Sequence, residues 1–114
     1  MTPFDVVLVP FPFADLTTAK QRPCLLLESV KVDRLANLLI VAMMTSQVDG
    51  RAFPHDVSVK DWHGAGLPKP TLIRLSKLVT VESKLIRRKL GRLTPHDQTA
   101  KKTAFQRLFR AWVA

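Results

Sequence analysis

The sequence has 114 residues, of which 46% are apolar, and a formal net charge of +9. A chain of this length makes one domain, because a second core would be too small to be stable alone, and the apolar fraction excludes a disordered chain. No apolar run approaches the ~18 residues of a membrane-spanning helix, and the first residues lack the basic start and long apolar stretch of a signal peptide. We therefore expect one soluble domain, residues 1–114, that stays in the cytoplasm and binds no membrane.

The first half of the chain has the composition of β-strands. Residues 5–13 are rich in β-branched and aromatic side chains and predict a strand that ends or bends near Pro10, because proline cannot donate to a ladder. A polar loop at 14–21 leads to a second predicted strand at 24–30. Residues 38–44 are almost entirely apolar and predict a central strand covered on both faces.

The next part of the chain predicts shorter strands. Residues 55–59 begin a short strand, and 61–70 contain glycines and prolines that indicate an irregular loop. Residues 71–75 predict another strand, which 78–81 continue. Residues 83–90 fit either a short helix or a strand.

The C-terminus has the pattern of a helix. Thr94 is a favourable N-cap, Pro95 suits the first helical position, and Asp97 suits the positive end of the helix dipole. An apolar stripe at helical spacing is expected to pack on a sheet. With about five strands, this helix predicts a small, curved, mainly antiparallel β-barrel. The stripe comprises Ala104, Phe105, Leu108, Phe109, Trp112 and Val113.

The positive charge is concentrated at one end of the sequence. Residues 1–73 carry seven basic and seven acidic side chains, whereas residues 74–114 carry eleven basic and two acidic ones. Such asymmetry is typical of a polyanionic partner, either a nucleic acid or an acidic protein segment, although a basic face that only keeps the protein soluble would look the same.

Several common kinds of chemistry are absent from the sequence. The single cysteine, Cys24, lies in an apolar run and predicts a buried, inert thiol in a reducing compartment. His55 and His63 match no standard metal-ligand spacing and are expected on the surface. We find no phosphate-binding or dinucleotide-binding loop and no nucleophile elbow, so we expect neither a metal nor a cofactor.

Polar residues at the ends of predicted strands are the best candidates for a site. Arg22 ends a polar loop, Thr45 follows the most buried strand, and Arg74 interrupts an apolar one. If they converge, two guanidiniums and a hydroxyl would suit a phosphate group. The alternative is that these are separate surface arginines and an ordinary strand end.

Several segments resemble the MazF/PemK toxins of type II toxin–antitoxin systems. Residues 5–13 and 22–27 are similar to the family's opening strand, loop and "RPALVLS" segment. Residues 41–47 resemble its strand ending in Thr-Ser/Thr-Gln, and 66–74 its "GL-P-S-hydrophobic-R" segment. Residues 90–93 resemble its "lGrLs" motif, so the likeness runs in order through nearly the whole chain.

The resemblance implies an SH3-like, CcdB-like antiparallel barrel, a two-fold homodimer, and sequence-selective cleavage of single-stranded RNA (mRNA) without metal. The expected reaction is attack by the 2′-hydroxyl, which leaves a 2′,3′-cyclic phosphate and a 5′-hydroxyl. By position, Arg22, Thr45 and Arg74 match catalytic residues, and a cognate antitoxin would cover the RNA groove with an acidic, flexible tail. Neighbouring polar residues are expected to bind RNA: Lys20, Gln21, Ser46, Gln47, Ser76 and Lys77.

The sequence departs from the family pattern at three positions. Phe4 replaces the usual glycine, and Cys24 replaces alanine. Ser76 stands where some relatives place an aspartate proposed as general base, and a neutral serine is a poor base. Asp15 or Glu28 would have to substitute in that role. Two other functions therefore stay open, a CcdB-like poison that binds gyrase through residues 107–113, and a passive nucleic-acid-binding barrel.

Overall fold

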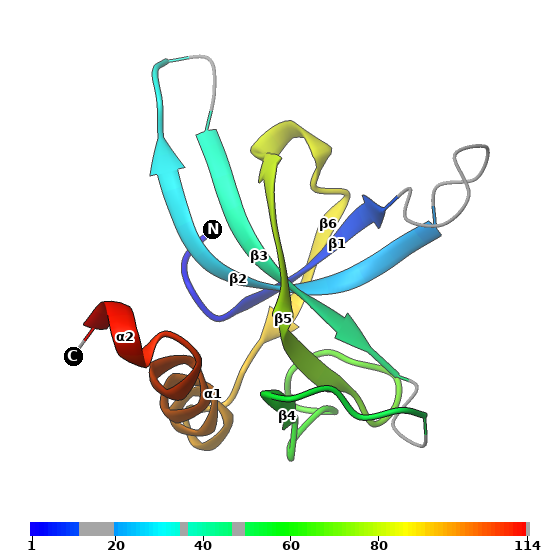
Figure 1. Ribbon diagram of the computed structural model, residues 1–114. Coiled ribbons are helices and arrows are strands. Elements are labelled where there is room, and N and C mark those ends of the chain that lie inside the picture. The colour runs from blue at the N-terminus through cyan, green and yellow to red at the C-terminus, as the bar shows by residue number, and fades with distance from the viewer. Residues whose placement is uncertain (12–19, 35–36, 47–49, 114) are drawn as a thin grey trace.

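The computed structural model describes residues 1–11, 20–34, 37–46 and 50–113. Its centre is a strongly curved, six-stranded antiparallel sheet with the strand order β4-β5-β3-β2-β1-β6 (Figure 1). A short 3₁₀ turn, η1 (Ser83–Leu85), precedes the last strand, and two helices, α1 (Pro95–Leu108) and α2 (Arg110–Val113), end the chain. The strands are β1 (Asp5–Phe11), β2 (Lys20–Lys31), β3 (Asn37–Thr45), β4 (Asp56–Ser58), β5 (Leu72–Glu82) and β6 (Arg88–Arg92).

The predicted fold class, mainly antiparallel β with a C-terminal helix, is confirmed. The sheet is not a closed barrel, since β4 and β6 are its two edges and do not pair within the described residues. The ambiguous segment 83–90 becomes η1 followed by the start of β6. The charged sequence at the start of β6 left helix and strand equally open, and pairing with β1 decides its conformation. Pro10 lies inside β1, one residue before its end.

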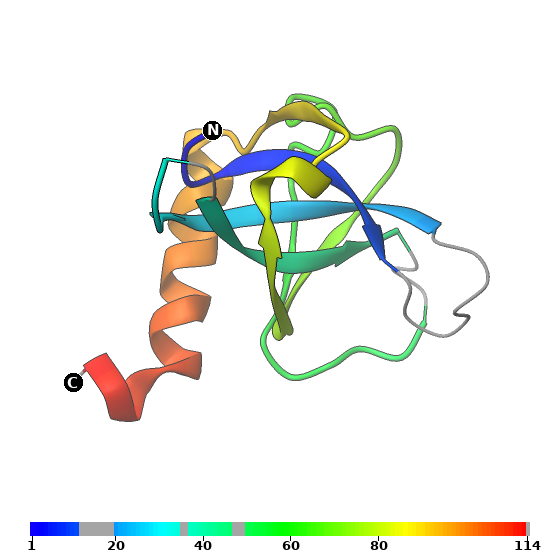
Figure 2. The same cartoon turned by 90° about the horizontal axis from the view of Figure 1, so that it is seen from above.

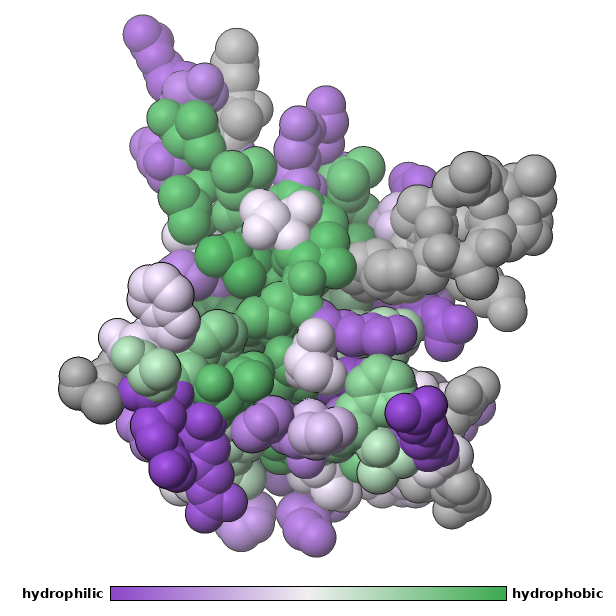
Figure 3. Space-filling view, viewed as in Figure 1, coloured by the Kyte–Doolittle hydropathy of each residue, from purple (hydrophilic) through white to green (hydrophobic). Residues whose placement is uncertain are grey.

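Strand alternation divides the buried side chains between the two faces of the sheet. One core cluster packs Val6, Leu25 and Met44 against α1 and the segment before β5. A second cluster, which includes Cys24 and Val41, lies on the opposite face. Figure 2 shows α1 crossing one end of the sheet, and Figure 3 shows apolar residues gathered over β2, β3 and β5 on the face turned to the viewer.

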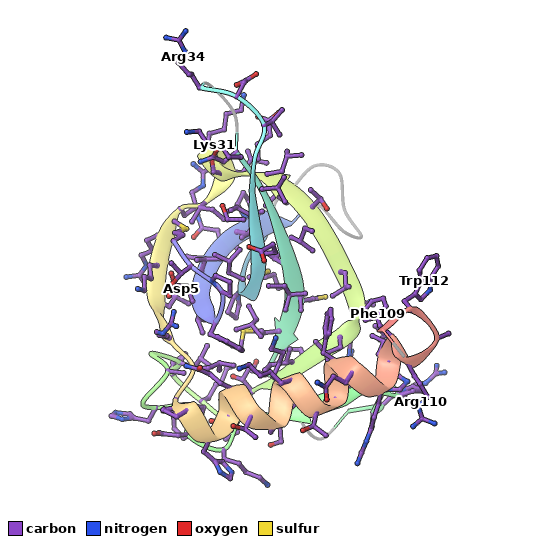
Figure 4. The ribbon with its side chains drawn as sticks, turned by 90° about the vertical axis from the view of Figure 1, so that its left-hand side faces the viewer. Asp5, Lys31, Arg34, Phe109, Arg110 and Trp112 are labelled. Atoms are coloured by element: carbon purple, nitrogen blue, oxygen red, sulfur yellow. The ribbon has the colours of Figure 1, made fainter. Side chains whose placement is uncertain are left out.

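The C-terminal helix packs on the sheet through only part of its apolar stripe. Ala104, Phe105 and Leu108 contact the first core cluster, as predicted. The chain then turns at Phe109 into α2, and Trp112 is 88% exposed and points away from the sheet (Figure 4). The prediction that the whole stripe is core was therefore wrong at its end. None of the helices in the described ranges is long and apolar enough to cross a membrane.

Phe4 adopts a backbone conformation that side chains other than glycine rarely take, with φ of 77°. This is the position where the resembling family has glycine. The Phe4 ring lies 4.5 Å from the Lys101 amine, which is itself largely buried. Burial, with a smaller contribution from Lys102, lowers the pKa of Lys101. Ring and amine thus interact where a glycine would leave the amine without this partner.

Candidate active-site cleft

A cleft of about 960 Å³ lies where β2 begins and β3 ends. The segment before β5 and one side of β6 complete its walls. Its volume is at the upper end of the ~300–1,000 Å³ that ligand pockets usually occupy. Its lining residues are Leu8, Gln21, Arg22, Pro23, Met44, Thr45, Ser46, His63, Gly66, Leu67, Pro68, Lys69, Thr71, Arg88 and Leu90.

Arg22 and Thr45, two of the three residues predicted to be catalytic, both line this cleft. Cys24 of β2 lies opposite Met43 of β3. The pairing of β2 with β3 ends there, two residues after Arg22 on β2 and two residues before the end of β3 at Thr45. Thr45 is 6% exposed and Arg22 is half-buried. Two residues 23 positions apart in the sequence thus come to line the same cleft, beside the last paired residues of β2 and β3.

Arg74, the third of these residues, lies on the neighbouring strand but does not line the cleft. On β5 it is opposite Met43, diagonally across from Thr45. Its guanidinium donates to both carboxylate oxygens of Asp56, at 3.2 and 3.1 Å, and to the Arg51 carbonyl at 3.2 Å. It also lies 3.7 Å from the centre of the Phe53 ring. These contacts hold the Arg74 side chain against β4 and the residues that precede it.

The residues predicted to bind RNA divide into three groups. Gln21 and Ser46 line the cleft beside Arg22 and Thr45. Ser76 and Lys77 are exposed on β5, where the register with β3 is interrupted by a bulge, and they do not line the cleft. The remaining two, the Lys20 side chain and Gln47, fall outside the described residues.

Three charged or titratable residues of the cleft were missed by sequence reasoning. Lys69 and Arg88 add two cations, and His63 adds an imidazole. With Arg22 the lining therefore holds three basic side chains, and none of its described residues is acidic. The basic run at residues 87–89 was the available signal for Arg88, whereas Lys69 and His63 sit in a loop that gave none. An anion is the ligand that such a lining favours.

A turn at residues 61–66 carries His63 to the cleft. The carboxylate of Asp97, at the start of α1, accepts hydrogen bonds of 2.9 Å from the backbone N–H groups of Lys60 and Asp61. On its other side the turn lies directly against β6, because a β-carbon on Gly66 would overlap the Leu90 carbonyl. The sequence analysis predicted that Asp97 favours the positive end of the helix dipole. The structure adds that its carboxylate also binds the backbone of the turn.

Asp5, on the neighbouring strand β1, holds β6 in place through two ion pairs. This buried carboxylate accepts a 2.9 Å hydrogen bond from the Thr2 N–H and pairs with Lys89 and Arg92 at 3.2 and 3.1 Å. Burial alone would raise the pKa of Asp5, but these hydrogen bonds together outweigh it and the pKa is lowered. The pairing holds β6 on β1 and so positions Arg88 at the cleft.

Thiol and metal chemistry find no support among the described residues. Cys24 is fully buried, and burial raises its pKa to about 12, as expected for an inert thiol. His55 and His63 are exposed. No group of three His, Cys, Asp or Glu side chains in the described ranges is placed to hold a metal ion.

Comparison with known proteins agrees with this architecture. Residues 2–109 match the model of the PemK-like, MazF-like toxins of type II toxin–antitoxin systems. The chain belongs to this family. The resemblance inferred from the sequence motifs is therefore confirmed, and it extends over all the cleft residues. A comparison with curated proteins gives no sequence match.

Solved structures share the fold of this family member. The Mycobacterium tuberculosis toxin MazF-mt6 is 20% identical, with a TM-score of 0.69 over 93% of this chain and 96% of that one. A mycobacterial endoribonuclease in complex with its cognate antitoxin is 15% identical, with a TM-score of 0.71 over 96% and 95%. At these identities the likeness establishes the fold alone.

Proposed function

We propose that this toxin cleaves single-stranded RNA in the cleft at the ends of β2 and β3, without a metal ion. The observation that carries the proposal is the joint presence of Arg22 and Thr45 in a cleft lined by cations and by no described acid. The substrate is a polyanion that supplies its own nucleophile, the 2′-hydroxyl. Attack on the adjacent phosphorus leaves a 2′,3′-cyclic phosphate and a 5′-hydroxyl.

Arg22 and Thr45 stabilise the reacting phosphate in this proposal. A guanidinium stays cationic at all relevant pH values, so Arg22 offsets the charge that develops on the phosphate oxygens. The Thr45 hydroxyl donates a hydrogen bond to one of those oxygens. Gln21 and Ser46 hold the flanking nucleotides, and Lys69 and Arg88 bind the neighbouring phosphates.

Arg74, which does not line the cleft, has a different part in this proposal. Its bidentate pairing with Asp56 satisfies the guanidinium, so we assign it the positioning of β4 and of the wall beside Thr45 rather than direct contact with the scissile phosphate. We therefore expect that replacing Arg22 lowers the rate of cleavage, whereas replacing Arg74 lowers the stability of the fold.

We further propose a homodimer and an acidic antitoxin as partners. The large apolar residues Val30, Val32 and Leu85 are between 42% and 57% exposed, which leaves apolar surface for a second copy. The cationic cleft suits the acidic tail of a cognate antitoxin, and a structural relative was solved with its own antitoxin. An antitoxin bound there would block RNA.

The test is to incubate the purified protein with a defined single-stranded RNA in excess EDTA and to map the ends. The proposal predicts discrete cuts with cyclic phosphate and 5′-hydroxyl ends, while DNA of the same sequence binds but stays intact. Binding without cleavage would favour a passive nucleic-acid-binding protein. Gyrase-dependent DNA breaks with intact RNA would favour a poison of the CcdB kind.

A further inference from the structure

One titratable side chain among the described residues that line the cleft, the imidazole of His63, has no part in the reaction proposed so far. Among the described lining residues Arg22, Lys69 and Arg88 are cations, Thr45 and Ser46 are neutral hydroxyls, and none is a carboxylate. The imidazole of His63 is the exception, because histidine is the side chain whose ordinary titration falls between about pH 5 and 8.

We infer that His63 is the general base of this toxin, an assignment that rests on the proposed RNA cleavage. The imidazole takes the proton of the 2′-hydroxyl while the 2′-oxygen bonds to phosphorus and the bond from phosphorus to the 5′-oxygen breaks. Water gives the 5′-oxygen its proton, and the imidazolium neutralises the hydroxide that remains. No oxidant, metal or further reactant enters the balance.

The turn that carries His63 is fixed at several points. Its backbone closes on itself, with Gly66 N–H donating to the His63 carbonyl at 3.1 Å and Leu67 N–H to the Trp62 carbonyl at 2.9 Å. The imidazole meets the Trp62 ring edge to face, with ring centres 6.1 Å apart and planes at 79°. Trp62 in turn packs on the first core cluster, so the imidazole is exposed to substrate yet supported from behind.

The other described groups that were considered as a base, or that lie near His63, are outside the cleft lining or already hold a hydrogen bond or ion pair. Ser76 lies on β5 outside the cleft, and Glu28, one of the two substitutes considered from the sequence, is exposed and accepts a hydrogen bond from the Ser29 N–H. The carboxylate of Asp56 is already paired with Arg74. Asp61, the acid in the same turn as His63, accepts a 2.8 Å hydrogen bond from the Gly64 N–H.

The experiment compares cleavage-rate profiles from pH 5 to 9 for the wild type, His63→Gln and, as a matched control, His96→Gln, an exposed histidine on α1 that does not line the cleft. Wild type and control should share a limb that rises with pH as the imidazole loses its proton. His63→Gln should lose that limb and fall about a hundredfold or more at the plateau. Added imidazole should restore part of the activity of His63→Ala, which a purely structural role would not allow.

Each outcome decides between the two proposals. If the wild type leaves RNA intact or yields other ends, the proposed function fails and the role of His63 fails with it. If the wild type cleaves as proposed while folded His63→Gln keeps both rate and limb, only His63 is excluded. Asp15→Asn and Asp49→Asn, at the two aspartates outside the described residues, complete the set, and loss of the limb in either of them with His63→Gln unaffected would also overturn the assignment.

Discussion

Arg74 and Asp56, 18 residues apart, form a two-point ion pair between the facing strands β5 and β4. Their side chains are only 11% and 7% exposed, and the guanidinium also covers the Phe53 ring. The backbone N–H of Phe53 donates to the same carboxylate at 2.8 Å. The pair therefore fastens the segment before β4 to the sheet, next to the strand that carries Thr45.

Replacing Arg74 should lower the stability of the folded protein, and it should not remove a group that takes part in the reaction. Arg74→Ala leaves the buried Asp56 carboxylate without its cation, a change worth about 3 kcal/mol in other buried pairs. The free energy of unfolding in urea should fall by that order. A double-mutant cycle with Asp56→Ala should show strong coupling between the two residues. Additive losses would mean that the pair contributes nothing, and an inactive Arg74→Ala of full stability would place Arg74 in the chemistry instead.

Phe4 offers a test of backbone strain. A residue with a β-carbon in the left-handed region costs about 1–2 kcal/mol, and glycine avoids this cost. Phe4→Gly should therefore be more stable than Phe4→Ala by about 1 kcal/mol, the reverse of the usual order for these two residues. Both variants lose the contact of the ring with Lys101 equally, so their difference in urea midpoint isolates the backbone effect. An alanine variant as stable as the glycine variant would show that the conformation is unstrained.

Gly91 should be intolerant of any side chain. A β-carbon there would overlap the Ala65 carbonyl in the turn that carries His63. Gly91→Ala must therefore push the turn off β6, and we expect both a lower melting temperature and a loss of RNA cleavage. Unchanged melting and cleavage would show that the turn does not depend on this close approach.

Asp5 should make stability depend on pH in the acid range. Because its pKa is lowered in the folded chain, its contribution is complete above the ordinary range of aspartate and is lost as the pH falls through the folded pKa. Asp5→Asn should cost about 2 kcal/mol at pH 7 and much less at pH 3. Urea unfolding of both proteins at the two pH values measures this. A gap that widens on acidification would contradict the assignment.

Local signals predicted much of the fold. The apolar run at 38–44 became the central strand β3, and the cap and stripe at 94–108 became α1. Strand β6 was ambiguous because its sequence is charged and only its pairing with β1 makes it a strand. Trp112 follows the helical spacing of the stripe, yet the turn at Phe109 takes it off the sheet.

Residues of the candidate cleft were predictable from the sequence where family motifs mark them, but not where segments distant in the sequence come together. Arg22 and Thr45 follow strand-end motifs, and they share the cleft. The ion pair of Arg74 depends on Asp56, whose position opposite it on a neighbouring strand no local pattern reveals. His63 and Arg88 reach the cleft through contacts of their elements with α1 and β1, which are long-range in sequence.

The central claim is that Arg22 stabilises the transition state of RNA cleavage, and one comparison tests it most directly. Arg22→Ala and Arg34→Ala remove the same charge, but Arg34 lies in the connection between β2 and β3 (Figure 4) and does not line the cleft. Measured on one defined RNA in EDTA, cleavage by folded Arg22→Ala should fall about a hundredfold or more, while Arg34→Ala keeps nearly the wild-type rate. Equal rates for the two folded variants would contradict the account.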